Sequence, residues 1–411
     1  MDHGYVTAVY HIRLPKTANV VKQAERLAVG QTTGTWTDVP GITKEFKDRY
    51  VGKIVDIYDV PPCELETEEE NEYQDYLIHI AFPGVHSQGN ITLLLTCLLG
   101  NDASTSAQVK LMDIVFPREY SEALTGPLWS IEELRKRCRA GKRPLLLNMI
   151  KPCTGITPDK GAEIFFQSAC GGADIIKDDE LLGNPAYSPI RDRVRAYKAA
   201  SRAAYEKSGV QTLYFPNITD EPGKMEEHLK QAQEEGADGV MVNFAVAGYG
   251  ALKELREKTE LPILAHCAGI GTYGEGRSGG MASSLALGKL SRLCGADMVM
   301  MNTPYGGYPL TYTRYVQTYL NLTLPFYGIK PSIPVIGGGV HPQMAEYYIK
   351  ELGTEIIIAA GGAVQGHPMG CAAGATAMKQ AIECAAAGIS LKERAQESQE
   401  LSAALKKWGK N

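Results

Sequence analysis

The sequence predicts an α/β protein with two domains: an N-terminal ferredoxin-like α+β domain over residues 1–135, and a C-terminal (β/α)8 (TIM) barrel with additional C-terminal helices over residues 136–411. Two observations predict this architecture. From about residue 140 onward, eight short apolar runs alternate with amphipathic helical patterns, whereas the preceding residues follow a different order of elements. The polar segment KRCRAGKRP places the domain boundary near residues 125–142.

The N-terminal region has the element order β-α-β-β-α-β. The strand-like run VTAVYHIRL (6–14) precedes a helical pattern at 18–29. The remaining elements are strands at 53–60 and 76–83, a helix near 91–99 and a strand at 109–117. This order is typical of a small ferredoxin-like sandwich.

The C-terminal region contains eight apolar runs of the kind found in parallel strands that are buried on both faces. They are PLLLNMI (144–150), ADIIKDD (173–179), QTLYFPN (211–217), GVMVNF (239–244), PILAHC (262–267), ADMVMM (296–301), SIPVIGG (332–338) and TEIIIAAGG (354–362). Helical patterns lie between them at 159–169, 190–208, 224–235, 250–258, 281–294 and 342–352. A doubly wound open sheet is the alternative, but eight units favour a barrel. Further helical patterns at 371–387 and 391–407 are expected to pack outside it.

Composition excludes several classes of partner. The formal net charge is -5, so the composition shows no excess of basic residues of the kind that binds nucleic acid. No apolar stretch reaches 18 residues and the N-terminus has no signal-peptide pattern, so no membrane association is expected. Nine cysteines, several of them in apolar segments, favour reduced thiols in a cytoplasmic protein, and none has zinc-site spacing.

Polar and glycine residues follow the predicted strands at the ends where barrel active sites are built. They are Lys151, the segment KDDE (177–180), Asn217, Asn243, His266, the glycines 337–339 and the glycines 361–362. Asp and Glu oxygens suit Mg²⁺, and strand alternation places Lys177 and Asp179 on one face with Glu180 just beyond the strand. A buried salt bridge that closes the barrel is the alternative interpretation.

The two glycine clusters predict a phosphate site. Gly338 and Gly339 end the seventh strand, while Gly361 and Gly362 end the eighth. Backbone N–H groups at these strand ends commonly bind phosphate in barrels. Either pair alone is as often a tight turn.

The segment GGADIIKDDE (171–180) resembles the RuBisCO superfamily. The resemblance implies that CO2 converts Lys177 to a carbamate, which binds one Mg²⁺ per active site together with Asp179 and Glu180. RPLLLNMIKP (143–152) places Lys151 at the position of the family's enolising lysine, and ILAHCAG supplies the strand 5 histidine, His266. GGGVHP and GGAVQGHPMG resemble the two phosphate-loop segments.

The resemblance extends to the N-terminal region and implies a site shared between subunits. GTWTDVP (34–40) is similar to the family segment whose Thr35 and Trp36 reach a neighbouring subunit's phosphate site. Asn101 stands where the family has an asparagine that faces the partner's metal site. The working unit is therefore expected to be a homodimer or a higher homo-oligomer.

Departures from true RuBisCO predict that the protein does not fix CO2. Family residues that carry charge or polarity are replaced by Cys153, Cys267, Met300, Gly337, Gly307 and Gly30. The loss near Gly307 removes the lysine that steadies the carboxylated intermediate. The losses at Cys267, Met300 and Gly337 remove the second phosphate site, so the substrate is expected to carry one phosphate and an uncharged far end, for which a thioether is one candidate.

The leading functional hypothesis is enolisation or isomerisation of a phosphorylated ketose, with a methylthio-sugar phosphate as one candidate. Lys151 would abstract the proton, with its pKa lowered by the metal and the barrel interior. His266 would orient a hydroxyl or shuttle a proton, unless its role is structural. Asn101, Asn217 and Asn243 would hold substrate or metal-bound oxygens, or would cap backbone groups.

Two other functions are considered. Decarboxylation of a phosphorylated β-keto acid would pass through the same enediolate. A non-catalytic regulatory protein on the same scaffold is a third possibility. The lysine and three carboxylates expected in one barrel mouth argue against it. The segments PYGG and GTWTDVP resemble those of the diketo-methylthiopentyl phosphate enolase. However, Asn101 stands where that enolase has its lysine base, and this chain has an IKP motif that the enolase lacks. These differences predict that the chain is a different enzyme.

Overall fold

The computed structural model describes residues 4–35, 37, 39–62 and 72–409, and it divides the chain into two compact units. The first unit contains the residues up to Thr125 together with Gly269–Leu290 and Tyr327–Ile329. The second unit contains Gly126–Ala268, Ser291–Phe326 and the residues from Lys330 onward.

The first unit is built on a four-stranded antiparallel sheet in the order β2-β3-β1-β4. Its main elements are β1 (Tyr5–Pro15), α1 (Val20–Gly30), α2 (Lys44–Tyr50), β2 (Lys53–Val60), β3 (Tyr73–Pro83), α3 (Ile91–Leu98) and β4 (Lys110–Val115). This is the β-α-β-β-α-β arrangement expected from the sequence, with α2 as an addition. The antiparallel ferredoxin-like sheet is confirmed.

The second unit is an eight-stranded parallel barrel, as predicted. Its strands are β5 (Leu145–Met149), β6 (Ile175–Lys177), β7 (Leu213–Phe215), β8 (Val240–Val242), β9 (Ile263–Ala265), β10 (Met298–Met301), β11 (Ile333–Ile336) and β12 (Ile357–Ala359). Hydrogen bonds from the Met241 N–H to the Pro216 carbonyl (2.8 Å) and from the Ile218 N–H to the Met241 carbonyl (3.0 Å) join the two edge strands. The sheet thereby closes on itself.

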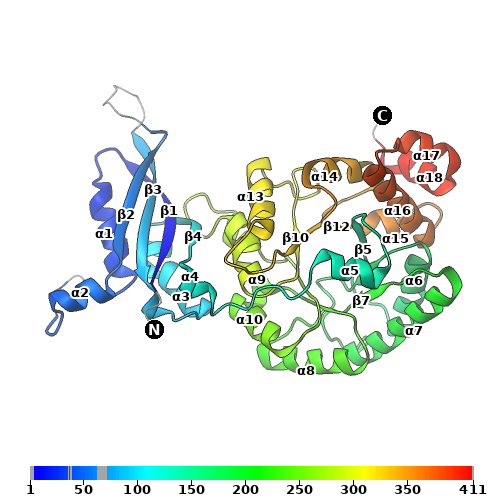
Figure 1. The fold of residues 1–411 in the computed structure, drawn as a ribbon, viewed down its shortest axis with the longest axis horizontal. Coiled ribbons are helices and arrows are strands. Elements are labelled where there is room, and N and C mark those ends of the chain that lie inside the picture. Colours follow the sequence, from blue (N-terminus) through cyan, green and yellow to red (C-terminus); the bar gives the residue numbers. More distant parts are fainter. Residues whose placement is uncertain (1–3, 36, 38, 63–71, 410–411) are drawn as a thin grey trace. The chain divides into compact units, whose positions relative to one another are not determined.

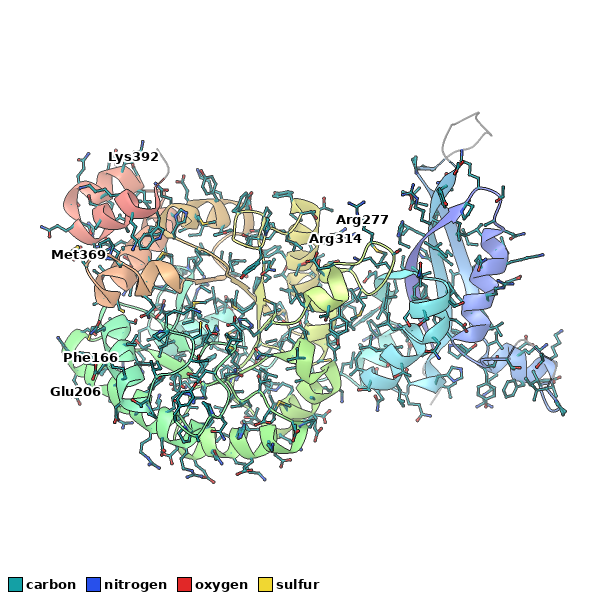
Figure 2. All side chains as sticks on the ribbon, turned by 180° about the vertical axis from the view of Figure 1, so that it is seen from behind. Phe166, Glu206, Arg277, Arg314, Met369 and Lys392 are labelled. Carbon is teal, nitrogen blue, oxygen red and sulfur yellow. The ribbon has the colours of Figure 1, made fainter. Side chains whose placement is uncertain are left out.

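Helices surround the barrel strands (Figure 1). They are α6 (Pro158–Cys170), α7 (Ile190–Ser208), α8 (Pro222–Glu234), α9 (Phe244–Ala247), α10 (Tyr249–Lys258), α12 (Ser291–Leu293), α13 (Tyr312–Thr323), α14 (Ala345–Leu352), α15 (Gly362–Gln365), α16 (Cys371–Ala387), α17 (Leu391–Glu397) and α18 (Gln399–Trp408). The labelled side chains of Phe166 on α6 and Glu206 on α7 lie on this outer layer (Figure 2). None of the described helices combines the length and hydrophobicity that a bilayer crossing requires.

The barrel core is filled by the inward-facing residues of its strands. Leu145, Phe215, Met241 and Val335 belong to this buried cluster, and α5 (Ile131–Cys138) adds Leu134 to it. The segment that contains α5 covers the amino end of the barrel, because the Asp297 carboxylate just before β10 accepts hydrogen bonds from the N–H groups of Leu128 and Trp129. The opposite, carboxyl end of the strands carries the polar residues.

Candidate active site

The polar residues predicted at the strand ends gather at the carboxyl end of the barrel. Lys151 follows β5, Lys177 is the last residue of β6 and His266 follows β9. β5 and β6 are hydrogen-bonded neighbours, with Met149 paired to Lys177. Because neighbouring parallel strands end at the same edge, the two lysines lie on one rim.

The Lys177 side chain is buried completely inside the barrel. Its Nζ donates a hydrogen bond to the Asp178 carbonyl at 2.9 Å. Burial lowers the pKa of Lys177, although the negative charges of Glu180 and Asp179 act in the opposite direction. A buried amine between carboxylates is thus present where the sequence predicted a carbamylated lysine.

The Lys151 amine pairs with Asp179 rather than standing alone. Its Nζ is 2.5 Å from Asp179 Oδ2 and 2.9 Å from Cys153 Sγ. Burial on its own lowers the pKa of Lys151, but the hydrogen bonds and charges of Asp179 and Cys153 raise it to about 12. In this arrangement the carboxylate partner outweighs burial, whereas the expected lowering of the Lys151 pKa depends on a bound metal and stays a prediction.

Asp178 points away from the two lysines, so only two of the three acids in KDDE face the barrel mouth. Its carboxylate accepts hydrogen bonds from Arg193 Nε at 3.0 Å, the Tyr214 hydroxyl at 2.7 Å and the Asn217 N–H at 2.9 Å. The side chains of Arg193 and Asp178 are both fully buried. The expectation of three carboxylates in one barrel mouth is wrong, since strand alternation turns the middle acid toward α7.

His266 is held close to Glu180 as a neutral imidazole. Its Nδ1 accepts a hydrogen bond from the Ala268 N–H at 3.2 Å, which leaves the proton on Nε2. That nitrogen is 3.6 Å from Glu180 Oε2. Burial and the positive charge of Lys177 hold the pKa of His266 well below its ordinary value.

The two strand-end asparagines hold backbone in this arrangement. Asn217 Nδ2 donates to the Glu180 carbonyl at 3.1 Å, and Asn243 Nδ2 donates to the same oxygen at 2.9 Å. The Asn217 side-chain oxygen accepts hydrogen bonds from Thr219. Asn243 Oδ1 is buried and has no hydrogen-bond partner among the described residues. The amides therefore position the backbone of Glu180.

The four predicted phosphate glycines lie at two adjacent strand ends of the barrel. Gly338 and Gly339 follow β11 with φ angles of 93° and 82°, a left-handed conformation that favours glycine. The Gly307 N–H donates to the Gly338 carbonyl at 3.1 Å, so the PYGG segment packs on this turn. Gly361 and Gly362 follow β12, and a Cβ on Gly361 would lie 2.6 Å from Met149 Sδ.

The remaining predicted residues belong to the first unit. Asn101 is exposed and borders a cavity of about 550 Å³ that Gln31 and His86 also line. The Thr35 hydroxyl donates to the Thr37 carbonyl at 3.1 Å. Trp36 lies outside the described residues. The partner-reaching roles of these three residues stay predictions.

The donor set at the β6 end contains two carboxylates, and Mg²⁺ is commonly bound by one or two carboxylates together with water or substrate oxygens. In the described part of the chain, no three His, Cys, Asp or Glu side chains are grouped so that they could hold a metal ion. Asp179 and Glu180 supply hard oxygen donors, and the buried Lys177 amine lies beside them. A carbamate on Lys177 would add the third anionic ligand.

Sequence reasoning missed the residues that hold this site in shape. Arg193 and Tyr214 orient Asp178, and Thr219 fixes the Asn217 amide. Cys153 is a departure from the family pattern, and its sulfur contacts the Lys151 amine. The short spacing between Lys151 and Cys153 is the one sequence signal for these contacts. Arg193, Tyr214 and Thr219 lie far along the chain from KDDE, so no local pattern indicates their roles.

Comparisons with known proteins find one family for both parts of the chain. Residues 130–408 match the model of the ribulose bisphosphate carboxylase large chain, catalytic domain, and residues 2–120 match the N-terminal domain of the same chain. The ribulose bisphosphate carboxylase-like protein of Archaeoglobus fulgidus is 38% identical over 98% of this chain and 93% of its own. The 2,3-diketo-5-methylthiopentyl-1-phosphate enolase of Geobacillus kaustophilus is 34% identical over 95% of both chains.

Solved structures share the whole architecture. A rubisco-like protein (MtnW) from Alicyclobacillus acidocaldarius has a TM-score of 0.90 at 31% identity, covering 98% of this chain and 100% of that one. The octameric Rubisco from Pyrococcus horikoshii has a TM-score of 0.90 at 28% identity, covering 99% of this chain and 94% of that one. The similarity therefore spans both units.

Proposed function

Because the chain belongs to the ribulose bisphosphate carboxylase large-chain family, we propose that it is a RuBisCO-like enzyme that enolises or isomerises a phosphorylated ketose and does not fix CO2. The observation that carries the proposal is the contact of 2.5 Å between Lys151 Nζ and Asp179 Oδ2. This contact supports the proposal, because the candidate base then lies next to a candidate metal ligand. Proton transfer next to a carbonyl needs both groups together.

The cofactor proposed is one Mg²⁺ per active site, held by Asp179, Glu180 and a CO2-derived carbamate on Lys177. When bound, Mg²⁺ would polarise the substrate carbonyl and make the neighbouring C–H acidic. The full burial of Lys177 beside two carboxylates supports this assignment, because a carbamate would replace a buried positive charge by an oxygen ligand.

Lys151 is proposed to take the substrate proton. If a cation occupied the Asp179 carboxylate, that carboxylate would no longer raise the pKa of Lys151. Burial would then lower this pKa and favour the neutral amine, which can accept a proton. His266, neutral with its proton on Nε2, would donate a hydrogen bond to a substrate oxygen near Glu180. Asn243 Oδ1 and Asn101 would accept hydrogen bonds from substrate hydroxyls.

The substrate is proposed to carry one phosphate. Gly338, Gly339, Gly361 and Gly362 would bind it, with Thr35 and Trp36 of a second subunit contributing. Met300 and Cys267 present neutral side chains near the neighbouring strand ends, which suits an uncharged far end. The enolase relatives are named for a methylthiopentyl phosphate compound, so methylthio-sugar phosphates are the first substrates to test.

The enzyme is proposed to work in the cytoplasm as a homodimer or a higher homo-oligomer. Eight of the nine cysteines fall in the described residues, and all eight are free. Dimeric and octameric Rubisco structures are among the structural neighbours. Light scattering would give the mass in solution, and a monomer would contradict a site shared between subunits.

The function is tested by deuterium exchange. Protein treated with Mg²⁺ and bicarbonate is incubated in D2O with phosphorylated ketoses, and NMR follows the loss of the C–H signal. Exchange at the carbon beside the carbonyl is expected for a substrate with one phosphate. CO2 release from a β-keto acid phosphate without ketose exchange would instead favour the decarboxylase, and no ligand binding at all would favour a regulatory protein.

A further inference from the structure

A thiol and an amine are in contact at the mouth of the barrel. Cys153 Sγ lies 2.9 Å from Lys151 Nζ, and the same nitrogen contacts Asp179. Cys153 is partly exposed and the Lys151 side chain is 36% exposed, so neither side chain is closed off from solvent. The pair therefore has the proximity and access that a reaction between sulfur and nitrogen requires.

We propose that Cys153 is a peroxide-sensitive modification site at which oxidation joins its sulfur covalently to the nitrogen of Lys151. Hydrogen peroxide first transfers one oxygen to the thiol, which yields a sulfenic acid and water. The Lys151 amine then attacks the sulfenic sulfur, the S–O bond breaks, an S–N bond forms and a second water leaves. In sum, the thiol and the amine lose two hydrogens while peroxide is reduced to two waters.

Asp179 holds the Lys151 nitrogen in place for the second step. Its carboxylate accepts a hydrogen bond from Lys151 Nζ at 2.5 Å, while the same nitrogen lies 2.9 Å from Cys153 Sγ. The attacking amine gives up one hydrogen as the S–N bond forms, and the hydroxyl of the sulfenic acid leaves as water. Two equivalents of a small thiol would reverse the bond and restore both side chains. The modification therefore prevents Lys151 from accepting a proton until the bond is reduced. This consequence rests on the proposed role of Lys151 as the base.

The other described cysteines lack this arrangement. Cys267 also lies at the barrel mouth, but its sulfur faces the Asn302 amide oxygen at 3.9 Å, and burial raises the pKa of its thiol to about 11. Cys97 donates to the Gln31 carbonyl, and burial raises its thiol pKa to about 11 as well. Among the described residues, Cys153 is the cysteine whose sulfur contacts a lysine amine.

Peptide mass spectrometry tests the proposal without any turnover assay. The full-length protein is treated briefly with hydrogen peroxide, free thiols are blocked, and the protein is digested with trypsin. Residues 143–160 stay in one peptide because Arg143 and Lys151 precede prolines. This peptide is expected to become lighter by two hydrogens, to resist thiol blocking and to regain its mass with dithiothreitol. A peptide that only gains oxygen would overturn the proposal.

Two variants sharpen the test. Lys151→Arg keeps a cation beside the sulfur and the same tryptic peptide, but its guanidinium is a poor nucleophile, so oxygen gain without hydrogen loss is expected. Cys153→Ser should show no hydrogen loss, and any oxygen on its peptide is assigned to Met149 by fragmentation. Hydrogen loss that persists in Lys151→Arg would contradict the assignment of the amine. Because the readout is a mass, its failure leaves the deuterium-exchange test of the proposed function untouched.

Discussion

Two lysines at the ends of neighbouring strands have pKa values that shift in opposite directions. Burial lowers the pKa of Lys177, whereas Lys151 has its pKa raised to about 12 by the nearby Asp179 and Cys153 in spite of burial. The difference follows from geometry: Lys151 is partly exposed and reaches the Asp179 carboxylate, whereas Lys177 is fully buried and, among the described residues, donates to the Asp178 carbonyl. One residue type therefore supplies two roles, a proposed ligand precursor and a proposed base.

Lys177→Ala is expected to abolish both Mg²⁺ binding and deuterium exchange, because the third anionic ligand is lost. Isothermal titration with Mg²⁺ in bicarbonate buffer measures the first effect and NMR the second. Lys160→Ala, an exposed lysine on α6, serves as the control and should change neither. Full activity in Lys177→Ala would refute the carbamate assignment.

Arg193→Ala is expected to destabilise the protein by about 3–5 kcal/mol, because it leaves the buried Asp178 carboxylate without its cation. Urea unfolding of the variant measures the loss. Arg191→Ala removes an exposed ion pair two residues earlier on the same helix and should have little effect. Equal stability of the two variants would show that Asp178 does not depend on Arg193.

At the scale of elements, boundaries were predicted well where local signals coincide. α7 spans Ile190–Ser208, as predicted, because Pro189 precedes it and Gly209 ends it in a left-handed conformation. The helix predicted over 281–294 is instead a π-helix at Ser284–Leu290 followed by the short α12. The helix predicted over 391–407 is split into α17 and α18 by Ser398, which caps α18.

The PYGG segment offers a test of loop packing. A Cβ on Gly306 would lie 2.3 Å from the Gly338 carbonyl oxygen, whereas a Cβ on Gly307 meets nothing within 4 Å. Gly306→Ala is therefore expected to displace the segment and break the Gly307 to Gly338 hydrogen bond. Hydrogen exchange over residues 304–310 should rise in Gly306→Ala and stay near wild type in Gly307→Ala. Equal exchange would mean that this packing is not maintained in solution.

At the scale of the whole molecule, the barrel brings together groups that the chain separates. Asn217 and Asn243, 37 and 63 residues beyond Glu180, both donate to its carbonyl. His266 approaches the same residue from β9. The parallel order of the strands makes these contacts unavoidable, since each strand ends at one rim.

Acid stability provides a prediction at this scale. Burial lowers the pKa of His341 from its ordinary value of 6.5, and its Nδ1 has no hydrogen-bond partner among the described residues. Below pH 6.5, His341 therefore binds a proton more readily in the unfolded chain than in the folded chain. The free energy of unfolding is unaffected by this group above pH 6.5 and decreases as the pH falls below it. Urea midpoints should fall less steeply with decreasing pH in His341→Gln, and parallel curves would contradict the prediction.

The sequence by itself determined the class of each domain and the placement of KDDE at a strand end, because hydrophobic periodicity and turn residues act locally. It also pointed to Lys151, His266 and the glycine turns through motif resemblance. Only the tertiary structure decided that Asp178 faces Arg193, that Asn217 and Asn243 hold the Glu180 backbone, and that Lys151 is paired with Asp179. These outcomes depend on which side chains meet across different strands, and such distances are set by barrel closure rather than by local pattern.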